Sequence, residues 1–409
     1  MPLLSPESLF VSRRFAPLFA TQFLGAFNDN LFKTALLFLI AFRLGAAPAA
    51  AATLVTAAAG VFILPFFLFS GIAGRLADAV DKARVARGVK LAEVAILAAG
   101  GAGLLLASVP LLFAVLFAMG THSTVFGPVK YAILPQHLHA GEVLAGTALV
   151  EGGTFIAILL GQIAGGLLPT QLAAVAMIAV ALAGVGAAWA IPPAPPAADA
   201  RPVDLNPLTA SVTVLRGAFA VPAVVRATVA ISWFWALGTI YTSQFVPLVA
   251  AWHASPRVAT LFLVVFTVGV ATGAAGVTRL LGGDVSARAA PWAAAAMALA
   301  SVALIAAIGV GPASVVVAGG RGAAIIMSLF VLAVAGGVFS VPLYAILATA
   351  GGAATRSSGI AANNVVNAAF QVAGTLVAGA AVAAGAPIPV VLAATGATAL
   401  LLIPMLRRL

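Results

Sequence analysis

Long apolar runs recur from one end of the chain to the other, separated by short breaks that hold polar residues, glycine or proline. Most of these runs reach the roughly 20 residues that an α-helix needs to cross the hydrocarbon core of a bilayer. They are too long and too uniformly apolar for the alternating segments of a membrane β-barrel. The pattern therefore predicts an all-α polytopic membrane protein with about 12 transmembrane helices. The predicted helices cover residues 15–42, 50–72, 86–108, 110–133, 144–168, 171–192, 217–249, 257–280, 289–310, 323–349, 358–384 and 386–406.

Composition and charge narrow the class further. Hydrophobic residues make up 63% of the 409 residues and charged residues only 7%, whereas soluble domains carry about 25% charged residues. The absence of cysteine excludes disulfides, thiolate metal sites and cysteine nucleophiles. The net charge of +10 is compatible with a nucleic-acid partner, but membrane topology explains the basic residues better, and we predict no nucleic-acid binding.

The basic residues also predict the orientation of the helices. Cytoplasmic loops of membrane proteins are enriched in lysine and arginine, and with both termini in the cytoplasm nearly all the loop cations fall on that side. The opposite loops then keep only Arg43, Arg257 and Arg321. We therefore predict cytoplasmic N- and C-termini. The cations on the cytoplasmic side are Arg13, Arg14, Arg75, Lys82, Arg84, Arg87, Arg201, Arg216, Arg279, Arg288, Arg356, Arg407 and Arg408.

The first predicted helix carries polar residues inside its apolar run. Asp29 and Lys33 lie in the middle, accompanied by Gln22, Asn28 and Asn30. A charge at the bilayer centre costs about 2.5–3.5 kcal/mol on insertion scales, so its presence there needs a reason. Asp29 and Lys33 are one helical turn apart and either neutralise each other or line a polar cavity. The neighbouring asparagines favour the cavity, because a self-neutralising pair does not explain them.

Polar residues on other helices are candidates for the same cavity. Lys130 and Tyr131 on the fourth predicted helix and Glu151 on the fifth add a cation, a hydroxyl and a carboxylate. Lys130 either faces the site or extends to the cytoplasmic edge of the membrane. Tyr241 and Gln244 offer neutral hydrogen bonds. Four residues in the second half serve either the substrate or helix packing, and these are Asn363, Asn364, Asn367 and Gln371.

The centre of the chain divides it in two. The stretch "IPPAPPAADARPVDLNP" is rich in proline and predicts a cytoplasmic linker over 193–216. We predict an N-terminal six-helix bundle over 1–192 and a C-terminal six-helix bundle over 217–409. The segment "FGPVKYAIL" at 126–134 matches "FSVPLYAIL" at 339–347, about 213 residues further on, which favours two parallel repeats.

The connection between the second and third predicted helices has a recognisable spacing. The stretch "GIAGRLADAVDKARVARG" places Gly74, Asp78, Lys82 and Arg84 in the pattern Gly-x-Leu-x-Asp followed by basic residues. This pattern resembles the loop signature of the major facilitator superfamily and implies conformational gating. An ordinary basic loop explains the cations but not the Gly and Asp spacing. Gly74 permits close helix approach, and Asp78 either caps a neighbouring helix or pairs with an arginine. The second half keeps a weaker form with Arg279, Asp284 and Arg288.

Three segments together are more specific. "TQFLGAFNDNLFKTAL", "FGPVKYAILPQ" and "GTALVEGGTFIAILLGQIAGG" resemble the bacterial lysophospholipid transporter family, a branch of the major facilitator superfamily. The resemblance implies the superfamily fold and a flippase that moves lysophospholipids, such as lysophosphatidylethanolamine, inward across the inner membrane. It also implies contact with membrane lipids and a functional link to a separate lysophospholipid acyltransferase, which reacylates the product. The chain departs from some members in having no arginine between Trp233 and Pro247.

The chemistry of a lysophospholipid matches the polar residues. Its phosphate is anionic, and Lys130 or Lys33 is the expected partner; its ammonium is cationic, and Asp29 or Glu151 is the expected partner. The expected mechanism is alternating access, with the two bundles rocking around a central site. The sequence has no ATP-binding motif, and we expect no cofactor. Proton coupling through the carboxylates and uncoupled flipping both remain open.

Other classes fit less well. Another transporter of the superfamily, an exporter or symporter of an amphipathic or small polar solute, would share the fold but not the specific segments. A membrane-bound acyltransferase is suggested by "HLHAGE", with His137, His139 and Glu142, but that loop is too short for a catalytic domain. The same residues make a weak metal site. A receptor or scaffold would not need buried charges. We therefore predict a transporter that is not an enzyme and holds no metal.

Overall fold

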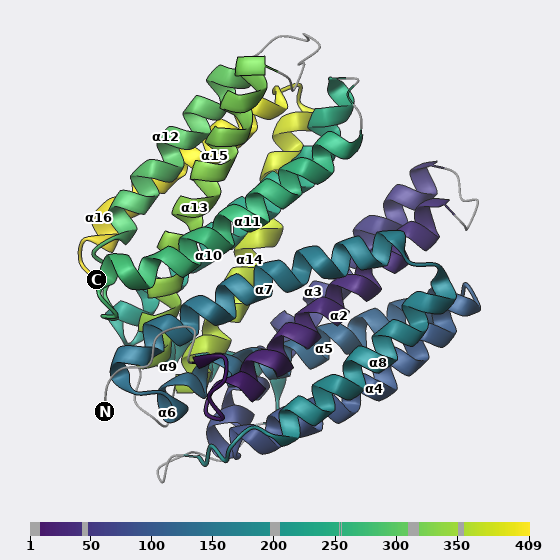
Figure 1. Cartoon of the computed structure of the whole chain (residues 1–409), viewed down its shortest axis with the longest axis vertical. Coiled ribbons are helices and arrows are strands. Elements are labelled where there is room, and N and C mark those ends of the chain that lie inside the picture. Colours follow the sequence, from purple (N-terminus) through teal and green to yellow (C-terminus); the bar gives the residue numbers. More distant parts are fainter. Residues whose placement is uncertain are drawn as a thin grey trace. The chain divides into compact units, whose positions relative to one another are not determined.

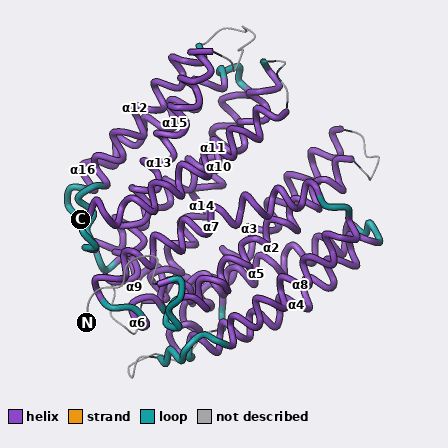
Figure 2. The backbone as a smooth tube through the Cα atoms, viewed as in Figure 1, coloured by secondary structure: helices purple, strands orange, loops and turns teal. Residues whose placement is uncertain are grey.

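The structure is a computed structural model that describes residues 9–42, 48–196, 205–252, 254, 256–309, 319–350 and 356–409. Within these ranges every regular element is a helix (Figure 1), and Figure 2 shows the helices joined by loops and turns. Twelve of the described helices are long and apolar enough to cross a membrane. In a bilayer the helix satisfies its own backbone hydrogen bonds, which explains this uniformity. The predicted fold class, an all-α polytopic membrane protein, is confirmed. Two of the cations used to predict orientation, Arg43 and Arg201, lie outside the described residues.

The helices form two compact units that interleave along the chain. The first unit contains Met1–Gly146, Ile156–Val221 and Ala348–Val365, and the second contains Thr147–Phe155, Pro222–Leu347 and Val366–Leu409. Helices α7 and α14 are therefore divided between the units. The division of the sequence into two halves with a linker stays a prediction. The first residues of α7 and α14, Val143 and Arg356, are separated by the same offset as the two matching segments noted in the sequence.

The first unit has a core of aliphatic, aromatic and methionine side chains. Phe32, Leu97, Met119 and Met177, from four different helices, all lie in it. Helix α4 lies along α8 (Figure 1), and α5 lies along α3. The elements of this unit, including the shared helix α7, are α2 (Ala16–Phe42), α3 (Pro48–Ala79), α4 (Lys82–Leu105), α5 (Val109–Ala132), α6 (Leu134–His137), η1 (Ala140–Glu142), α7 (Val143–Leu167), α8 (Thr170–Trp189) and α9 (Pro207–Phe219).

The second unit has an aromatic core near the end of α10. Tyr241, Phe245 and Phe262 pack edge to face, with ring centroids 6.4 and 5.6 Å apart along the series. The last predicted helix, 386–406, is interrupted by a 3₁₀ segment. The elements of this unit, including the shared helix α14, are α10 (Pro222–Ala251), α11 (Pro256–Leu281), α12 (Ala290–Ile308), α13 (Gly319–Thr349), α14 (Arg356–Ala383), α15 (Ile388–Ala397), η2 (Thr398–Leu402) and α16 (Ile403–Leu406).

Helix α9 spans the end of the predicted linker, 193–216, where the sequence analysis predicted no helix. Asn206 caps this helix by accepting hydrogen bonds from the backbone N–H groups of Leu208 and Thr209, and Pro207 occupies its first position, where proline is favoured. The buried residues Ala210, Val214 and Ala218 recur every four residues, so the helix has one apolar face, and it packs on α3. The proline-rich composition before Asn206 concealed this short amphipathic helix.

Glycine lets helices α11 and α13 approach within backbone contact. A Cβ built on Gly273 would lie 2.0 Å from the Val334 carbonyl oxygen, and one built on Gly337 would lie 2.2 Å from the Val270 carbonyl oxygen. Small residues permit such close packing in membranes, where van der Waals contact contributes strongly to helix association. These two glycines therefore hold α11 against α13.

This packing is testable with two substitutions on the same helix. Gly273→Ala should lower the free energy of unfolding by about 1–3 kcal/mol, because the new methyl group must displace backbone. Gly276→Ala is the matched control, since no heavy atom lies within 4 Å of its added Cβ. The control should be neutral or slightly stabilising. Thermal unfolding of the purified variants in detergent measures both, and equal unfolding temperatures for the two variants would contradict the packing.

Candidate functional site

The predicted polar residues of the first helix lie beside a buried ionic network that sequence reasoning missed. Glu93 on α4 is fully buried, and its carboxylate has donors on both oxygens. Asn28 Nδ2 donates to Oε1 over 3.1 Å, and Lys90 Nζ donates to Oε2 over 2.5 Å. His122 Nε2 on α5 lies 3.3 Å from the same Oε2. Three helices of the first unit thus converge on one carboxylate.

Two glycines make room for the Lys90 side chain of this network. A Cβ built on Gly25 of α2 would lie 2.6 Å from Lys90 Nζ, and one built on Gly184 of α8 would lie 3.6 Å from it. The ring of Phe126 is 5.8 Å from the same ammonium. Because Lys90 is completely buried, its charge is balanced inside the protein rather than by water. The network therefore positions α2, α4, α5 and α8 relative to one another.

The spacing of Lys90 and Glu93 could have revealed them. They are three residues apart in an otherwise apolar helix, which is the same kind of signal that identified Asp29 and Lys33. They lie near the start of the predicted third helix, 86–108, and the sequence analysis did not select them. Asn28 connects the polar residues of α2 to the Lys90–Glu93 pair, because its amide donates to Glu93. The same amide also donates to the Met177 carbonyl oxygen on α8.

Asp29 and Lys33 form the more accessible part of the cluster. Both are only partly buried, unlike Asn28, Lys90 and Glu93. The Asp29 Oδ2 atom accepts a hydrogen bond of 2.6 Å from the Ser123 hydroxyl on α5. Its Oδ1 atom is buried and has no hydrogen-bond partner among the described residues. The Lys33 ammonium lies 4.3 Å from the centroid of the Phe62 ring on α3. Asp29 therefore keeps one acceptor oxygen that no described donor satisfies.

The other predicted residues of the first unit are more dispersed. Gln22 and Asn30 are buried, and Asn30 donates to the Ala26 carbonyl oxygen of its own helix. Lys130 is partly buried with its ammonium 4.8 Å from the centroid of the buried Tyr131 ring. Neither placement brings these residues to Asp29 in a described contact, so their binding role stays a prediction.

The start of α14 adds two asparagines to the first unit. Asn363 is fully buried, and neither its amide nitrogen nor its amide oxygen has a hydrogen-bond partner in the described part of the chain. Asn364 lies against α5, where its Nδ2 atom is 2.8 Å from the position of a Cβ on Gly127. Glycine at 127 therefore leaves the space that the Asn364 amide uses.

The second unit has a polar and aromatic cluster of its own. Gln371 on α14 accepts a hydrogen bond of 2.9 Å from the Thr239 hydroxyl on α10 and donates to Asn367 Oδ1 over 3.3 Å. One turn before Thr239, the Trp235 indole N–H donates to the Tyr344 hydroxyl on α13 over 2.6 Å. Asn367 and Gln371 were predicted, whereas Thr239, Trp235 and Tyr344 were missed. Tyr344 belongs to the repeated segment, which was a signal for it.

Glu151 and Phe155 come from the part of α7 that belongs to the second unit. The Phe155 ring stacks on Trp235 with centroids 5.5 Å apart and planes 12° apart. Glu151 is buried one turn earlier. Tyr241, in contrast, is part of the core: its hydroxyl contacts the Ser301 hydroxyl and donates to the Leu392 carbonyl oxygen, each over 2.9 Å. These contacts give Tyr241 a structural role in the core of the second unit. Gln244 is partly buried on the next turn of α10.

The Gly-x-Leu-x-Asp motif lies on helix ends and not in a loop, which corrects the predicted boundaries. Helix α3 continues to Ala79, and α4 begins at Lys82 because Asp81 caps it through the N–H groups of Ala83 and Arg84. Of the two contacts considered for Asp78, the structure has the cap. Its carboxylate accepts hydrogen bonds of 2.9 and 3.0 Å from the Ser357 and Ser358 N–H groups.

The rest of the motif supports or surrounds this cap. The Ser358 hydroxyl donates to Asp78 over 2.6 Å, and Gly74 lies against α14, where an added Cβ would be 2.5 Å from Ala361 Cβ. Lys82 is buried, whereas Arg84 is exposed. Asp284, in the corresponding connection of the second half, is also exposed. The motif therefore anchors the first turn of α14 onto α3.

A family model of the Major Facilitator Superfamily matches residues 18–375, most of the chain. The chain belongs to the Major Facilitator Superfamily. Solved structures agree at the level of fold. The human organic anion transporter MFSD10 (TETRAN) has a TM-score of 0.75 at 16% identity and covers 96% of this chain and 99% of its own. The superfamily transporter FucP, in the outward conformation, has a TM-score of 0.73 at 15% identity over 96% of this chain and 97% of its own.

Curated relatives resemble the chain more closely over a shorter stretch. The lysophospholipid transporter LplT of Salmonella newport (strain SL254) is 35% identical over 145 residues, which are 35% of this chain and 34% of the relative. The LplT of Salmonella enteritidis PT4 (strain P125109) matches equally well. The matched stretch thus spans about a third of the length of these relatives. The similarity supports the resemblance stated from the sequence, and the superfamily makes this chain a membrane transporter.

The His137–Glu142 segment, which suggested an acyltransferase or metal site, has structural contacts. Glu142 accepts hydrogen bonds from the His139 backbone N–H and from the Arg14 guanidinium, over 2.9 and 3.1 Å. These contacts close the short 3₁₀ turn η1 before α7. Among the described residues no group of three or more His, Cys, Asp or Glu side chains is placed to hold a metal ion.

The ionic network around Glu93 predicts an asymmetric response to substitution. Lys90→Met alone should lower the free energy of unfolding by about 3–5 kcal/mol, because it leaves a buried carboxylate without its cation. The double variant Lys90→Met/Glu93→Leu should recover most of that loss, since both charges are removed together. Thermal unfolding and yield of folded protein in detergent provide the measurement. A double variant less stable than the single variant would refute this account of the network.

Proposed function

We propose that this transporter moves lysophospholipids of the lysophosphatidylethanolamine type inward across a bacterial inner membrane by alternating access. The proposal includes cytoplasmic termini and a separate acyltransferase that reacylates the delivered lipid. It assigns the chain no covalent chemistry of its own. The observation that carries it is Asp29, a partly buried carboxylate inside a membrane helix, one of whose oxygens is buried without a hydrogen-bond partner among the described residues. The partial similarity to LplT supports the choice of substrate.

The substrate's two headgroup charges match the two charged residues of the cluster. We assign the ammonium to Asp29 Oδ1, because Ser123 already holds the other oxygen. We assign the phosphate to Lys33, one helical turn further along α2, with Lys130 as the alternative cation. The fully buried Lys90–Glu93 pair takes no part in binding and keeps α2 in place. Glu151, Asn364 and Gln371 remain secondary candidates.

A proton symporter of another amphipathic solute is the second candidate function. One oxygen of Asp29 lacks a partner among the described residues, and such a group can accept a proton as readily as an ammonium donor. Both candidates need Asp29, and they differ in the cargo and in the need for a proton gradient. The transport experiment separates them.

Replacing Asp29 tests the proposal directly. Spheroplasts without their own lysophospholipid transporter would take up labelled lysophosphatidylethanolamine through the wild type, whereas Asp29→Ala should reduce uptake to background at matched membrane levels. Ser123→Ala should cause a smaller loss, because it removes one hydrogen bond and leaves the carboxylate in place. Asp284→Ala, at an exposed carboxylate, is the control and should transport like the wild type.

Each other outcome has a definite meaning. Folded wild-type protein that takes up no lysophosphatidylethanolamine would exclude the proposed substrate and leave the second candidate. Loss of folded protein in Asp29→Ala would assign that residue to structure. An uncoupler that stops uptake by the wild type would show proton coupling, and unchanged uptake would show flipping without it.

We further propose that Gly74, Asp78, Lys82 and Arg84 gate the conformational cycle. The Asp78 cap anchors the first turn of α14, and α14 continues beyond Val365 as part of the second unit. A contact that fixes one end of a shared helix is suited to favour one conformation over another.

Asp78→Ala should therefore slow transport more than it weakens substrate binding. Losing a helix cap costs about 0.5–2 kcal/mol, which corresponds to a severalfold change in the balance between two conformations. The maximal uptake rate and the affinity for lysophosphatidylethanolamine, measured side by side, provide the comparison. Asp78→Asn keeps one acceptor oxygen, and its transport rate should fall between those of the wild type and Asp78→Ala. Equal losses of rate and affinity would argue against gating.

A further inference from the structure

An open apolar groove lies on the second unit, formed by the end of α11 together with α12 and α13. Its volume is about 810 Å³. Apart from Arg288, all the lining residues that the structure describes are apolar, and they include Leu280, Trp292, Ala293, Met327, Val331 and Val338. An apolar groove on a membrane protein is filled by hydrocarbon, because lipid chains surround such surfaces. The occupant is therefore a lipid or another membrane protein.

The dimensions of the groove match one leaflet of a bilayer. Its lining on α13 extends from Met327 to Val338, which at 1.5 Å per residue is about 16 Å. Half of the hydrocarbon core is about 15 Å. The α12 side is lined by Ala289, Ala293 and Ala296, at helical spacing on one face, and their small side chains leave the width that an acyl chain needs.

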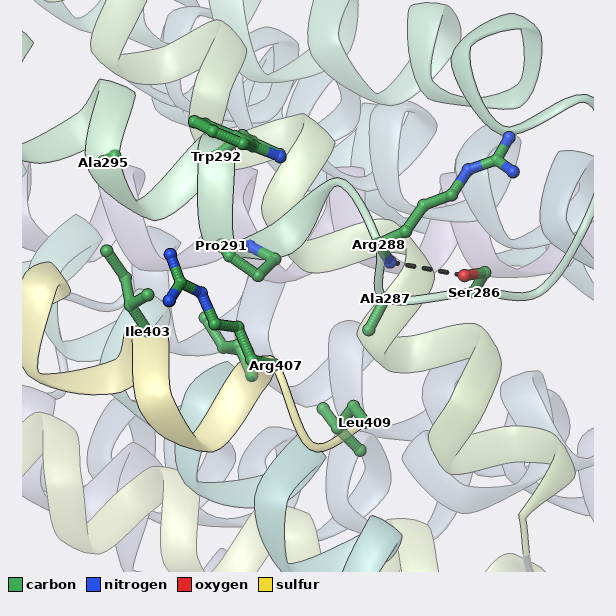
Figure 3. Close-up of a pocket in the computed structure, with 10 residues that line it drawn as sticks. Ser286, Ala287, Arg288, Pro291, Trp292, Ala295, Ile403, Arg407 and Leu409 are labelled. Carbon is green, nitrogen blue, oxygen red and sulfur yellow. Dashed lines mark hydrogen bonds between the residues drawn. The ribbon is translucent and has the colours of Figure 1, made fainter.

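A guanidinium marks one end of the groove. The exposed Arg288 lies just before α12, and its Nη2 atom donates to the Leu280 carbonyl oxygen at the end of α11 over 3.4 Å. On the other side of Trp292 is a second pocket of about 390 Å³, shown in Figure 3. Arg288 and Arg407 both line that pocket, and the guanidinium of Arg407 points away from that of Arg288 (Figure 3).

The surroundings of Arg288 carry an excess of positive charge. Arg407 is also exposed and lines the second pocket together with Arg288, whereas Asp284 is the carboxylate of the α11–α12 connection. None of the described side chains caps the N-terminus of α12, whose backbone N–H groups add partial positive charge. Basic pockets between membrane helices bind anionic lipid headgroups. Trp292, three-quarters exposed at 76%, has the amphipathic ring that favours the headgroup level.

We propose that this groove holds one acyl chain of a resident anionic phospholipid, with the lipid phosphate at Arg288. The charge at one end, the apolar lining and the length of one leaflet together select a bilayer phospholipid with a net negative headgroup. This site is formed by the second unit alone, and the inference does not depend on the substrate proposed above.

The test uses Trp292 as the reporter, because it lines the groove. The whole protein is placed in phosphatidylcholine nanodiscs that contain a minority of either brominated phosphatidylglycerol or brominated phosphatidylcholine. Bromine quenches tryptophan fluorescence on contact, and the difference between wild type and Trp292→Phe isolates the Trp292 signal. We expect stronger quenching of Trp292 by the anionic lipid. Arg288→Gln should lower the preference for the anionic lipid about fivefold, since a basic residue near the membrane surface contributes about that factor.

Two further variants make the result specific. Arg279→Gln removes an exposed cation that does not line the groove and should keep the preference. Ala296→Phe fills the groove while keeping Arg288, and it should reduce quenching by the anionic lipid. Equal quenching by both brominated lipids, or a preference that survives Arg288→Gln, would overturn the proposal. Displacement by lysophosphatidylethanolamine would identify a substrate site instead, and protection of Trp292 from both lipids, together with a dimer in solution, would identify a second copy of the chain.

Discussion

A carboxylate buried among apolar helices needs a hydrogen-bond donor for each of its oxygens, and Glu93 obtains its donors from two helices. Lys90 on the same helix and Asn28 on α2 donate to it, and His122 Nε2 on α5 lies 3.3 Å from one of its oxygens. Since an unpaired buried charge is strongly destabilising, these helices cannot shift independently. The position of α2, and with it the position of Asp29 and Lys33, follows from this requirement. The partly buried charges of Asp29 and Lys33 are therefore held in position by the fully buried pair of Lys90 and Glu93.

The sequence was sufficient for the helices and for part of the site. The length of the apolar runs alone located the 12 spans, because a bilayer permits few other structures. Asp29 was recognised because it is a charged residue inside one of these runs. The residues that contact Glu93 could not be predicted from the sequence. They come from α2, α4 and α5, which are far apart in sequence, and only the packing of the helices brings them together. Trp235 and Tyr344 were missed because aromatic residues are common in apolar helices and their hydrogen bond depends on the partner.

The motif of Gly74 and Asp78 shows a different limit. Its spacing was recognisable, but the helix ends around it were misplaced by several residues, because Ala and Leu continue the helix pattern up to Ala79. The contact itself followed from elementary chemistry, since a carboxylate is a good acceptor for the free N–H groups of a helix N-terminus. Its partners, Ser357 and Ser358, lie 279 and 280 residues away and could be identified only from the fold.

Close glycine contacts divide the helices into pairs that behave as single pieces. Gly273 and Gly337 bring α11 and α13 together through backbone atoms, and Gly161 and Gly165 do the same for α7 and α2, where an added Cβ would lie 2.3 and 2.5 Å from carbonyl oxygens. Backbone atoms cannot change rotamer, so such pairs have no soft side chains to absorb sliding. Motion in this protein must therefore occur at contacts made by longer side chains. These paired helices would act as rigid levers, and natural variation at these glycines would be strongly restricted, because even the Cβ of alanine would meet backbone atoms of the partner helix.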